Sequence, residues 1–577
     1  MTSPILQELH RLGHLDALDF GFARLLERRF AYSSPPPDSL VLAAALLVAA
    51  TRQGHTSLDF TQSPRELVTL VQDPGKPLPE ELLSSLSKDW KLPDRWLPIL
   101  GNPGELAPLI RDGSRLYLQR YHLAERGIAA EVVRRATRTA AELTDEQCAA
   151  IAEQWSQPHE ADQAQAVQRI LRHNLTIISG GPGTGKTHTV LRALSLLPPR
   201  EGRPWRVVLA APTGKAVARL QELVPSKLPD TVRAHFATLH RLLQRRPAEG
   251  RHDQGSGLPW PYDIAVVDEM SMVDAELMYD LVTAWTPETR VVLLGDRHQL
   301  ASVQPGNVFA GLCSGVLDAG PPVSDVLVEL RHNFRFDPRS GIGRLAEAIV
   351  RGQDQEVVDL LRAGAPDVTW QPLPRVEELT TRLWRKLRVA WRTLFESSSP
   401  SEALRALRSF RILSAHRSGP WGCERIHKEF AQQLGGTAVL HAPLVIVQNA
   451  PDRGLYNGDG GLWWRDGERW IAHIETAQGV RTLPESRLPP HEPAWVLTVH
   501  KSQGSEFDEV LLVLPQTVTP ILTRELLYTA VTRARQRLEI WAPLEVVRAA
   551  VRQPTRRFSG LSDLIPRLYS SEARPAF

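Results

Sequence analysis

Residues 177–187 join a β-branched run to a glycine-rich turn that ends in Gly-Lys-Thr. The turn consists of Gly180, Gly181, Pro182, Gly183, Thr184, Gly185, Lys186 and Thr187. Such glycines let successive backbone N–H groups converge on a polyphosphate, Lys186 can reach its β- and γ-oxygens, and the Thr187 hydroxyl can ligate magnesium. Residues 188–196 are expected to form a helix whose N-terminus faces the anion. We therefore predict a phosphate-binding loop, against the alternative of a strand-to-helix turn without a ligand.

Two acidic residues follow a second apolar run. Residues 264–267 read Ile-Ala-Val-Val, and Asp268 and Glu269 come directly after them. A fully buried parallel strand is continuously apolar, and ligands gather at the carboxyl ends of such strands. Asp268 then suits a magnesium ion and Glu269 suits activation of the attacking water. The alternative is that Asp268 or Ser271 only caps the next helix, which explains one acid but not the pair after a strand.

A third apolar run places an amide beside the same cleft. Residues 290–296 read Arg-Val-Val-Leu-Leu-Gly-Asp, and Gln299 follows three residues later. An uncharged amide can hydrogen-bond a γ-phosphate without neutralising it, so Gln299 is a candidate sensor that distinguishes ATP from ADP. Taken alone, a glutamine after a turn is more often simply solvated.

The elements that position these residues belong to a chain of 577 residues, long enough for three or four domains. The three cysteines, Cys148, Cys313 and Cys423, are too scattered for a metal or redox motif. The longest apolar run, residues 40–50, is too short to span a bilayer and predicts a buried helix. The N-terminus lacks the pattern of a secretory signal. A net charge of +3 permits DNA binding through local basic residues but does not require it.

Periodicity and turn residues suggest a domain plan. Residues 1 to about 140 have a helical pattern without visible chemistry, residues 141–328 alternate strands with helices, and residues 329–577 do so again. Between about 431 and 493, short β-like pieces alternate with Asn-Gly and Asp-Gly turns, which predicts a small β insert. Tryptophans in this insert could stack on bases, although aromatic residues in a small β-barrel more often form its core.

The order of the motifs resembles that of the superfamily 1 DNA helicases, and more narrowly the RecD family of RecBCD (exodeoxyribonuclease V) subunits. The resemblance rests on the three segments above and on the segments at residues 163–167, 209–216, 237–240, 333–336, 498–507 and 528–535, with weaker likeness at 54–58 and 112–118. It implies an α/β fold with two RecA-like P-loop motor domains, a helical N-terminal domain that docks a partner, and an SH3-like insert.

The resemblance also implies roles for residues that spacing alone does not single out. Gln163 would read the adenine, and His188 would complete the nucleotide site. Arg335 and Arg533 would lie opposite the γ-phosphate. The alternative interpretation of each is an ordinary surface ion pair. The DNA-contacting residues would be Thr213, Thr238, His240, Thr498 and His500, each of which could equally be a capping or core polar residue.

The implied activity is that of an ATP- and Mg²⁺-dependent DNA helicase in the bacterial cytoplasm, acting on double-strand DNA ends in recombinational repair. RecB-like and RecC-like subunits would be its partners, with the nuclease in the RecB-like partner, because the chain has no clustered acids with a lysine outside the motor motifs. Residues 295–306 resemble the 5′ to 3′ branch. The alternatives are a stand-alone RecD-like helicase, although no helix-hairpin-helix element is visible in residues 1–140, and a non-enzymatic module, against which the intact motifs argue.

Overall fold

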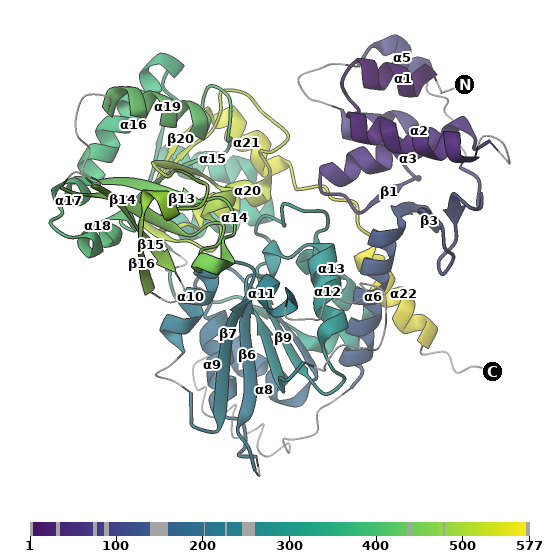
Figure 1. The fold of residues 1–577 in the computed structure, drawn as a ribbon, viewed down its shortest axis with the longest axis horizontal. Helices are drawn as coiled ribbons and strands as arrows, with labels where there is room; N and C mark the ends of the chain where they lie inside the picture. The colour runs from purple at the N-terminus through teal and green to yellow at the C-terminus, as the bar shows by residue number, and fades with distance from the viewer. Residues whose placement is uncertain are drawn as a thin grey trace.

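The computed structural model describes residues 4–30, 35–72, 78–85, 92–138, 160–200, 202–224, 228–244, 260–337, 339–434, 441–467, 469–476 and 479–572. These residues form an N-terminal region, two helix-covered parallel sheets and an antiparallel sheet beside the second of them (Figure 1). None of the described helices combines the length and the apolar character required to cross a membrane.

The first sheet has six parallel strands in the order β10-β5-β9-β8-β6-β7. They are β5 (Leu175–Gly180), β6 (Trp205–Ala211), β7 (Val232–Thr238), β8 (Ile264–Val267), β9 (Arg290–Gly295) and β10 (Leu327–Leu330). The helices of this unit are α8 (Ala161–Arg172), α9 (Lys186–Ser195), α10 (Gly214–Leu223), α11 (Leu239–Gln244), α12 (Ala275–Ala284) and α13 (Val308–Ala319). Strands β5, β9 and β8 are neighbours. The glycine-rich loop, the acid pair and the Gln299 segment follow these strands, so all three lie at the same edge of the sheet.

The second sheet has five parallel strands in the order β11-β20-β19-β12-β18. They are β11 (Val368–Gln371), β12 (Phe410–Ser414), β18 (Val496–Thr498), β19 (Phe507–Val513) and β20 (Ala534–Trp541). Its helices are α14 (Gly341–Arg351), α15 (Asp354–Ala363), α16 (Val376–Ala390), α17 (Arg392–Glu396), α18 (Pro400–Leu407), α19 (Cys423–Leu434), α20 (Arg524–Val531) and α21 (Leu544–Arg552). The prediction of an α/β protein with parallel sheets is confirmed.

An antiparallel sheet of five strands lies in the chain between α19 and β18. Its strands are β13 (His441–Ile446), β14 (Gly460–Asp466), β15 (Arg469–Thr476), β16 (Gly479–Pro484) and β17 (His491–Pro493), in the order β16-β15-β14-β13-β17. Residues 441–493 are therefore β-rich, as the turn pattern predicts, and the first residues of the expected insert belong instead to α19.

The N-terminal region contains the predicted helices and a sheet that the sequence did not predict. The helices are α1 (Pro4–Arg11), α2 (Ala17–Phe30), α3 (Asp38–Arg52), α4 (Pro64–Val71) and α5 (Glu80–Ser85). Residues 40–50 of α3 are buried throughout, which confirms the prediction of a buried helix. The sheet has the order β1-β4-β3-β2, with β1 (Ser57–Asp59), β2 (Leu100–Gly101), β3 (Leu109–Asp112) and β4 (Arg115–Leu118). Strands of two to four residues are too short to give a period-two pattern in the sequence.

Two helices complete the core of the first sheet from distant parts of the chain. Helix α6 (Gln119–Ala136) packs against α12, and the C-terminal helix α22 (Leu561–Glu572) packs against α13 and α6 (Figure 1). Ile128 and Val133 of α6 and Ile565 of α22 share one apolar cluster with strands β5, β8 and β9. The predicted domain boundaries, at residue 140 and for a second motor domain over 329–577, therefore differ from the observed packing. The apolar faces of α6 and α22 are buried against the first sheet.

Candidate functional site

The glycine-rich turn connects β5 to α9, as the sequence predicts. Gly183 and Gly185 have φ of 87° and 84°, in the left-handed region that side chains with a Cβ rarely adopt. The Lys186 ammonium lies against the loop and donates to the carbonyls of Gly180 at 2.5 Å and Gly181 at 3.2 Å. A helix N-terminus, left-handed glycines and a lysine thus converge in the geometry of a phosphate-binding loop.

The acid pair lies directly beside this loop. The Thr187 hydroxyl donates to Asp268 Oδ2 at 3.3 Å, and Asp268 Oδ1 accepts from the Glu269 backbone N–H at 2.8 Å. A hydroxyl and a carboxylate that meet in this way form a donor set suited to Mg²⁺, which prefers oxygen ligands. Among the described residues, Glu269 is the only non-glycine with a left-handed backbone, at φ 55°. Burial, reinforced by the charge of Asp268, raises the pKa of Glu269 and so suits it to accept a proton near neutral pH.

Side chains from two other segments hold the loop in place. Gln163 of α8 is buried and donates from Nε2 to the carbonyl of Thr184 at 3.2 Å. Asn333 donates from Nδ2 to the carbonyl of Pro182 at 2.8 Å. A Cβ at Gly185 would lie 2.6 Å from Gln163 Nε2, so close packing as well as backbone conformation requires glycine there. Gln163 is therefore held next to the turn, and its expected role in reading the adenine stays a prediction.

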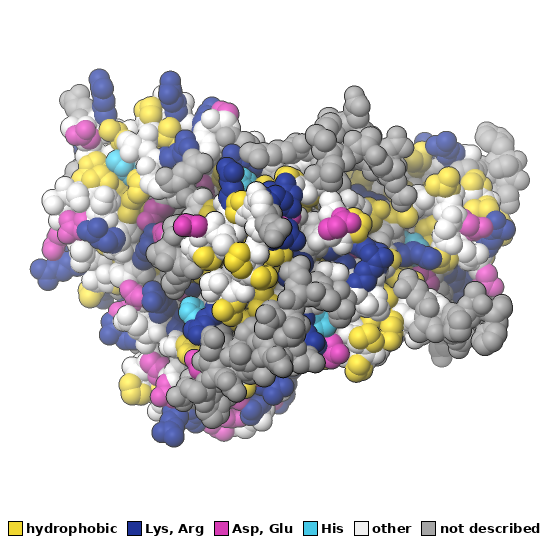
Figure 2. Space-filling model, turned by 90° about the horizontal axis from the view of Figure 1, so that it is seen from below, with side chains coloured by type: hydrophobic (Ala, Val, Ile, Leu, Met, Phe, Trp, Pro, Cys, Tyr) yellow, Lys and Arg dark blue, Asp and Glu magenta, His cyan; other side chains and the backbone are white. Residues whose placement is uncertain are grey.

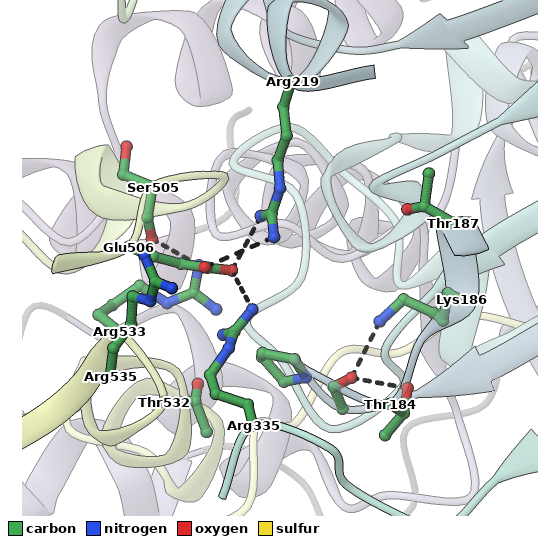
Figure 3. Close-up of polar contacts among 12 residues, drawn as sticks. Thr184, Lys186, Thr187, Arg219, Arg335, Ser505, Glu506, Thr532, Arg533 and Arg535 are labelled. Carbon is green, nitrogen blue, oxygen red and sulfur yellow. Dashed lines mark hydrogen bonds and ion pairs between the residues drawn. The ribbon is translucent and has the colours of Figure 1, made fainter. Parts of the chain in front are cut away.

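Two arginines from beyond the first sheet face the loop (Figure 3). Arg335 donates to Glu506 at 2.7 Å, and Arg533 donates to the Ser505 carbonyl at 3.1 Å. Within the described chain, Arg335 Nη1 and Arg533 Nη2 are buried and have no hydrogen-bond partner. Buried guanidinium N–H groups left unpaired are costly, so each is suited to bind an anion that enters the cleft. The surface ion pair that was the alternative for these arginines does not describe Arg533, which is buried and forms its hydrogen bonds with backbone carbonyls.

A cavity of about 220 Å³ joins these groups. Its lining includes Pro182, Gly183, Gly185, Lys186, Thr187, His188, Arg219, Asp268, Glu269, Asp296, Gln299, Arg335, Glu506 and Arg533. The first sheet thus contributes the loop and the acids, and the segments of the second sheet contribute arginines. One nucleotide-sized anion could contact both units at once.

Comparison with known proteins agrees with this geometry. RecBCD enzyme subunit RecD of Mycolicibacterium smegmatis is 35% identical to the chain over 94% of this chain and 97% of that protein. The same subunit of Mycobacterium tuberculosis is 35% identical over 97% of this chain and 96% of its own length. The chain belongs to the RecD family. Family models match residues 11–117 (RecBCD enzyme subunit RecD, N-terminal domain), 158–365 (AAA domain) and 493–540 (UvrD-like helicase C-terminal domain).

A RecD2 DNA helicase is also similar, but over less of its length. The ATP-dependent RecD2 DNA helicase of Deinococcus radiodurans is 29% identical over 66% of this chain and 50% of that protein. Half of the RecD2 helicase therefore has no counterpart in this alignment, whereas the two mycobacterial RecD subunits match almost from end to end.

The predicted sensor, Gln299, is buried at the contact between the two sheets of this RecD family member. Its Nε2 donates to Asp296 Oδ2 at 3.2 Å, and its Oε1 has no partner among the residues that the structure describes. The next residue, Leu300, accepts at its carbonyl from Gln503 Nε2 at 3.0 Å and donates from its backbone N–H to the Thr529 hydroxyl at 3.0 Å. Gln299 therefore lines the cavity and adjoins a direct connection to the second sheet.

The five predicted DNA contacts lie at the ends of strands or just beyond them. Thr213 caps α10 by accepting from Ala216 N, and Thr238 ends β7, the strand that pairs with β6. Thr498 ends β18 and accepts from Lys501 N, which also makes it a local cap.

Two histidines complete this set. His240 is exposed on α11. Burial, aided by Arg557, lowers the pKa of His500. The capping alternative thus holds for the threonines, whose hydroxyls accept from the backbone N–H groups of Ala216, Arg241 and Lys501. Thr238 is buried, and Thr213 and Thr498 are half-buried.

Surface charge adds little to this assignment. Figure 2 shows Lys and Arg side chains spread over one face of the molecule with Asp and Glu between them. This agrees with the net charge of +3 and gives no single basic patch on that face.

Four residues of the site were not assigned a role from the sequence. They are Arg219, Asp296, Glu506 and Tyr528. Asp296, Glu506 and Tyr528 lie inside recognisable motifs, so the family pattern could have drawn attention to them. Arg219 lies on a helix where a basic residue is expected to be solvated, and the sequence has no signal that distinguishes it.

The β insert contacts the first sheet's unit at α10. Asp459 is buried, and its Oδ1 would lie 3.1 Å from a Cβ placed on Gly214, the first residue of α10. Trp463 and Trp464 of β14 pack against apolar clusters, and Trp464 stacks on His441 at a centroid distance of 3.8 Å. Both tryptophans are therefore half-buried and pack against the apolar core of the insert and its neighbours, which favours the more ordinary of the two predicted roles.

Cysteine and metal chemistry add no further site in the described residues. Cys313 and Cys423 are buried free thiols, and Cys148 lies outside the described ranges. No group of three or more His, Cys, Asp or Glu side chains within the described ranges could hold a metal ion.

Proposed function

We propose that this chain is an ATP-dependent 5′ to 3′ DNA helicase and translocase, and a subunit of a RecBCD-like helicase-nuclease that acts on double-strand DNA ends. One observation carries the proposal. The cavity that contains Lys186, Asp268 and Glu269 is closed by Arg335 and Arg533, which arrive with the second sheet. A site divided between two units can convert nucleotide binding and release into relative motion of those units.

The residues divide the chemistry of hydrolysis among them. Lys186 and the backbone N–H groups of the loop bind the phosphates. His188, which lines the cavity, and Gln163, which donates to the loop at Thr184, would contact the rest of the nucleotide. Thr187 and Asp268 would hold Mg²⁺, which neutralises phosphate charge when bound. Glu269 accepts a proton from the attacking water, and Gln299 faces the γ-phosphate. Arg335 and Arg533 stabilise the charge that develops during transfer.

Translocation follows from the alternation of contacts between the units. The unpaired nitrogens of Arg335 and Arg533 gain charge-assisted hydrogen bonds only when an anion is present, so ATP favours the closed arrangement and hydrolysis removes that preference. Thr213, Thr238 and His240 on the first unit and Thr498 and His500 on the second would grip single-stranded DNA in turn. We propose RecA-like motors at 141–328 and 329–577, with α6 and α22 packed on the first motor, and an SH3-like fold for the insert.

The direct test uses a duplex with one single-stranded tail. With ATP and magnesium, the chain should unwind a duplex with a 5′ tail and leave one with only a 3′ tail intact, as residues 295–306 indicate. Lys186→Gln is the control: it removes the main point charge at the phosphates and should abolish DNA-stimulated ATPase and unwinding while most single-strand binding remains. Preference for the 3′ tail would contradict the polarity, and near-normal ATP turnover by the variant would contradict the site.

The partners are proposed to be RecB-like and RecC-like subunits, in the cytoplasm of a bacterium, with the nuclease on the RecB-like subunit. The end-to-end match to RecD subunits supports this over the stand-alone alternative. Co-purification from the native host separates the two, since a stand-alone helicase would elute without large partners.

The N-terminal region is the proposed docking domain. Leu18 and Leu25 lie seven residues apart on α2 and are 66% and 56% exposed, so one face of this helix presents apolar surface. Changing both to Glu should abolish co-elution with the partners and leave ATPase on single-stranded DNA intact. Deletion of residues 1–135 is not suitable, because it would remove α6 from the core of the first unit. Retained assembly of the double variant would assign docking to another surface.

A further inference from the structure

Arg219 lines the nucleotide cavity, but the proposed mechanism of hydrolysis does not use it. It projects from α10 and donates to Glu506, with Nη1 to Oε1 at 2.8 Å and Nη2 to Oε2 at 3.5 Å (Figure 3). Its side chain is 47% exposed, whereas that of Glu506 is only 15% exposed. This ion pair joins a helix of the first unit to the segment that leads into β19 of the second unit.

Glu506 is shared between two arginines. The oxygen that accepts from Arg219, Oε1, also accepts from Arg335 Nη2 at 2.7 Å. Burial alone would raise the pKa of Glu506, but Arg219 and Arg335 outweigh it and hold that pKa below its ordinary value. The carboxylate is therefore ionised, and the two guanidiniums compete for it.

Helix α10 contacts the 504–506 segment at two points. Lys215 donates from Nζ to the Ser505 hydroxyl at 3.2 Å, and Arg219 binds Glu506 one residue further on. Lys215 and Arg219 are four residues apart, so they lie on the same face of the helix. Two contacts one turn apart fix both the position and the direction of the segment relative to the helix.

The other end of this connection is a proposed DNA contact. Thr213, which caps α10, immediately precedes Gly214 and Lys215. A Cβ at Gly504 would lie 3.8 Å from the Thr213 hydroxyl oxygen, so the capping residue itself adjoins the segment that carries Glu506. A short rigid helix thus extends from the DNA side to the nucleotide cavity.

We propose that Arg219 is a positioning residue for ATP hydrolysis. By binding Glu506, it weakens the ion pair between Glu506 and Arg335, so that Arg335 is free to contact the γ-phosphate. Because Arg219 lies on α10, this effect depends on the DNA-contacting end of that helix. The inference rests on the proposed ATPase function. It assigns to α10 the coupling between DNA binding and the γ-phosphate arginine.

Removing Arg219 should slow hydrolysis more than it weakens nucleotide binding. In Arg219→Ala, Arg335 is the only close partner left for Glu506, so Arg335 stays bound to that carboxylate and is less able to reach the γ-phosphate. The kcat on saturating single-stranded DNA should therefore fall about 5- to 30-fold, the range expected from one lost ion pair in a network. KM for ATP should stay within about twofold of the wild-type value, because Arg219 does not bind ATP in this scheme. Turnover without DNA should change little.

A second substitution distinguishes positioning from a structural role. Arg219→Ala/Glu506→Gln removes the charge that retains Arg335, so it should recover part of the kcat that Arg219→Ala loses. Arg219→Lys, which keeps one charge, should lie between the wild type and Arg219→Ala. Arg362→Ala on α15 is the matched control, because Arg362 is exposed and lies outside the cavity.

The outcomes distinguish failure of the proposed ATPase function from failure of the role given to Arg219. If the wild-type chain shows no DNA-stimulated ATPase, the proposed function fails. If it does and Arg219→Ala keeps the wild-type kcat, the inference alone fails. A large rise in KM with kcat unchanged would make Arg219 a nucleotide contact and overturn the positioning role, and so would a double variant slower than Arg219→Ala. Melting curves check each variant, and Arg219→Lys decides the outcome if Arg219→Ala is unfolded.

Discussion

The Tyr528 hydroxyl of α20 donates to Asp296 Oδ2 at 3.0 Å, across the contact between the two sheets. The same oxygen accepts from Gln299 Nε2 at 3.2 Å. Burial and the charge of Asp296 raise the pKa of Tyr528 well above its ordinary value, so the hydroxyl stays protonated and remains a donor. The candidate γ-phosphate sensor is thus connected to the second sheet through one buried carboxylate.

Tyr528→Phe should weaken this connection without removing any group from the phosphates. Asp296 loses one of its donors in a buried setting, which costs about 1–3 kcal/mol. We expect fewer base pairs to be unwound per ATP hydrolysed, because sensing and motion become less tightly linked. Tyr569→Phe is the control, since the Tyr569 hydroxyl is exposed and donates only to the Pro321 carbonyl at 3.3 Å. Equal losses of ATPase and unwinding would argue against a coupling role.

Arg533→Ala should leave ATP binding measurable while hydrolysis slows greatly. An arginine that stabilises transition-state charge is worth about 10³ to 10⁵ in rate in comparable phosphoryl-transfer systems. Single-turnover hydrolysis and nucleotide affinity, measured side by side, separate the two effects. Arg537→Ala serves as the control, because Arg537 is 65% exposed and pairs with Glu509. Equal loss of binding and hydrolysis in Arg533→Ala would make this arginine structural.

The parts of the site that sequence predicts are those encoded over a few consecutive residues. Strands β5, β8 and β9 coincide with the apolar runs that end at the loop, the acid pair and the sensor segment, because a strand buried on both faces needs continuous apolar residues. The left-handed glycines Gly183 and Gly185 are likewise a local requirement of the turn. Such features can be recognised without knowledge of the tertiary fold.

The parts that sequence does not predict depend on contacts between distant segments. Arg219 and Glu506 are separated by 287 positions, and nothing in the helical pattern of α10 indicates this pair. The packing of α22 beside α6 joins the two ends of the chain, so it appears in no local pattern. Long-range packing of this kind decides which charged residues are paired and which are solvated.

Asp459 gives a prediction for the dependence of stability on pH. Burial raises the pKa of its carboxyl to about 6 from the ordinary 3.8. The folded state therefore binds this proton more tightly than the unfolded state does, and the associated stability is present below about pH 4 and lost as the pH rises through about 6. A shift of this size corresponds to about 3 kcal/mol.

Asp459→Asn should accordingly raise the unfolding midpoint at pH 8 and change it little at pH 4.5. The amide oxygen of the variant can accept from the Tyr456 backbone N–H, which donates to Asp459 Oδ2 at 2.8 Å in the native protein. Asp466→Asn, at an exposed position of the same insert, should show no such difference between the two pH values. A stabilisation that is equal at both would rule out titration of Asp459 as its cause.

Glu125 joins three segments that are far apart in the chain. Its buried carboxylate accepts from the Thr56 and Ser559 hydroxyls, each at 2.6 Å, and from the Gly560 backbone N–H at 2.9 Å. Thr56 belongs to the N-terminal region, Glu125 to α6, and the other two residues precede α22. This carboxylate therefore holds the N-terminal region and the C-terminal helix on the first unit.

Glu125→Ala should destabilise this junction by about 2–6 kcal/mol, because the Ser559 hydroxyl and the Gly560 N–H lose their acceptor and each unpaired group costs about 1–3 kcal/mol. The Thr56 hydroxyl can still donate to the Phe558 carbonyl at 3.1 Å. Glu125→Gln should have a smaller effect, since one amide oxygen still accepts while the amide N–H₂ faces a donor. Limited proteolysis with detection of fragments cut before residue 561 reports the release of α22. Glu347→Ala is the control, because Glu347 is exposed and pairs only with Arg351 on its own helix. If Glu125→Ala resists proteolysis as the wild type does, apolar packing of α22 on α13 is sufficient to hold the C-terminal helix.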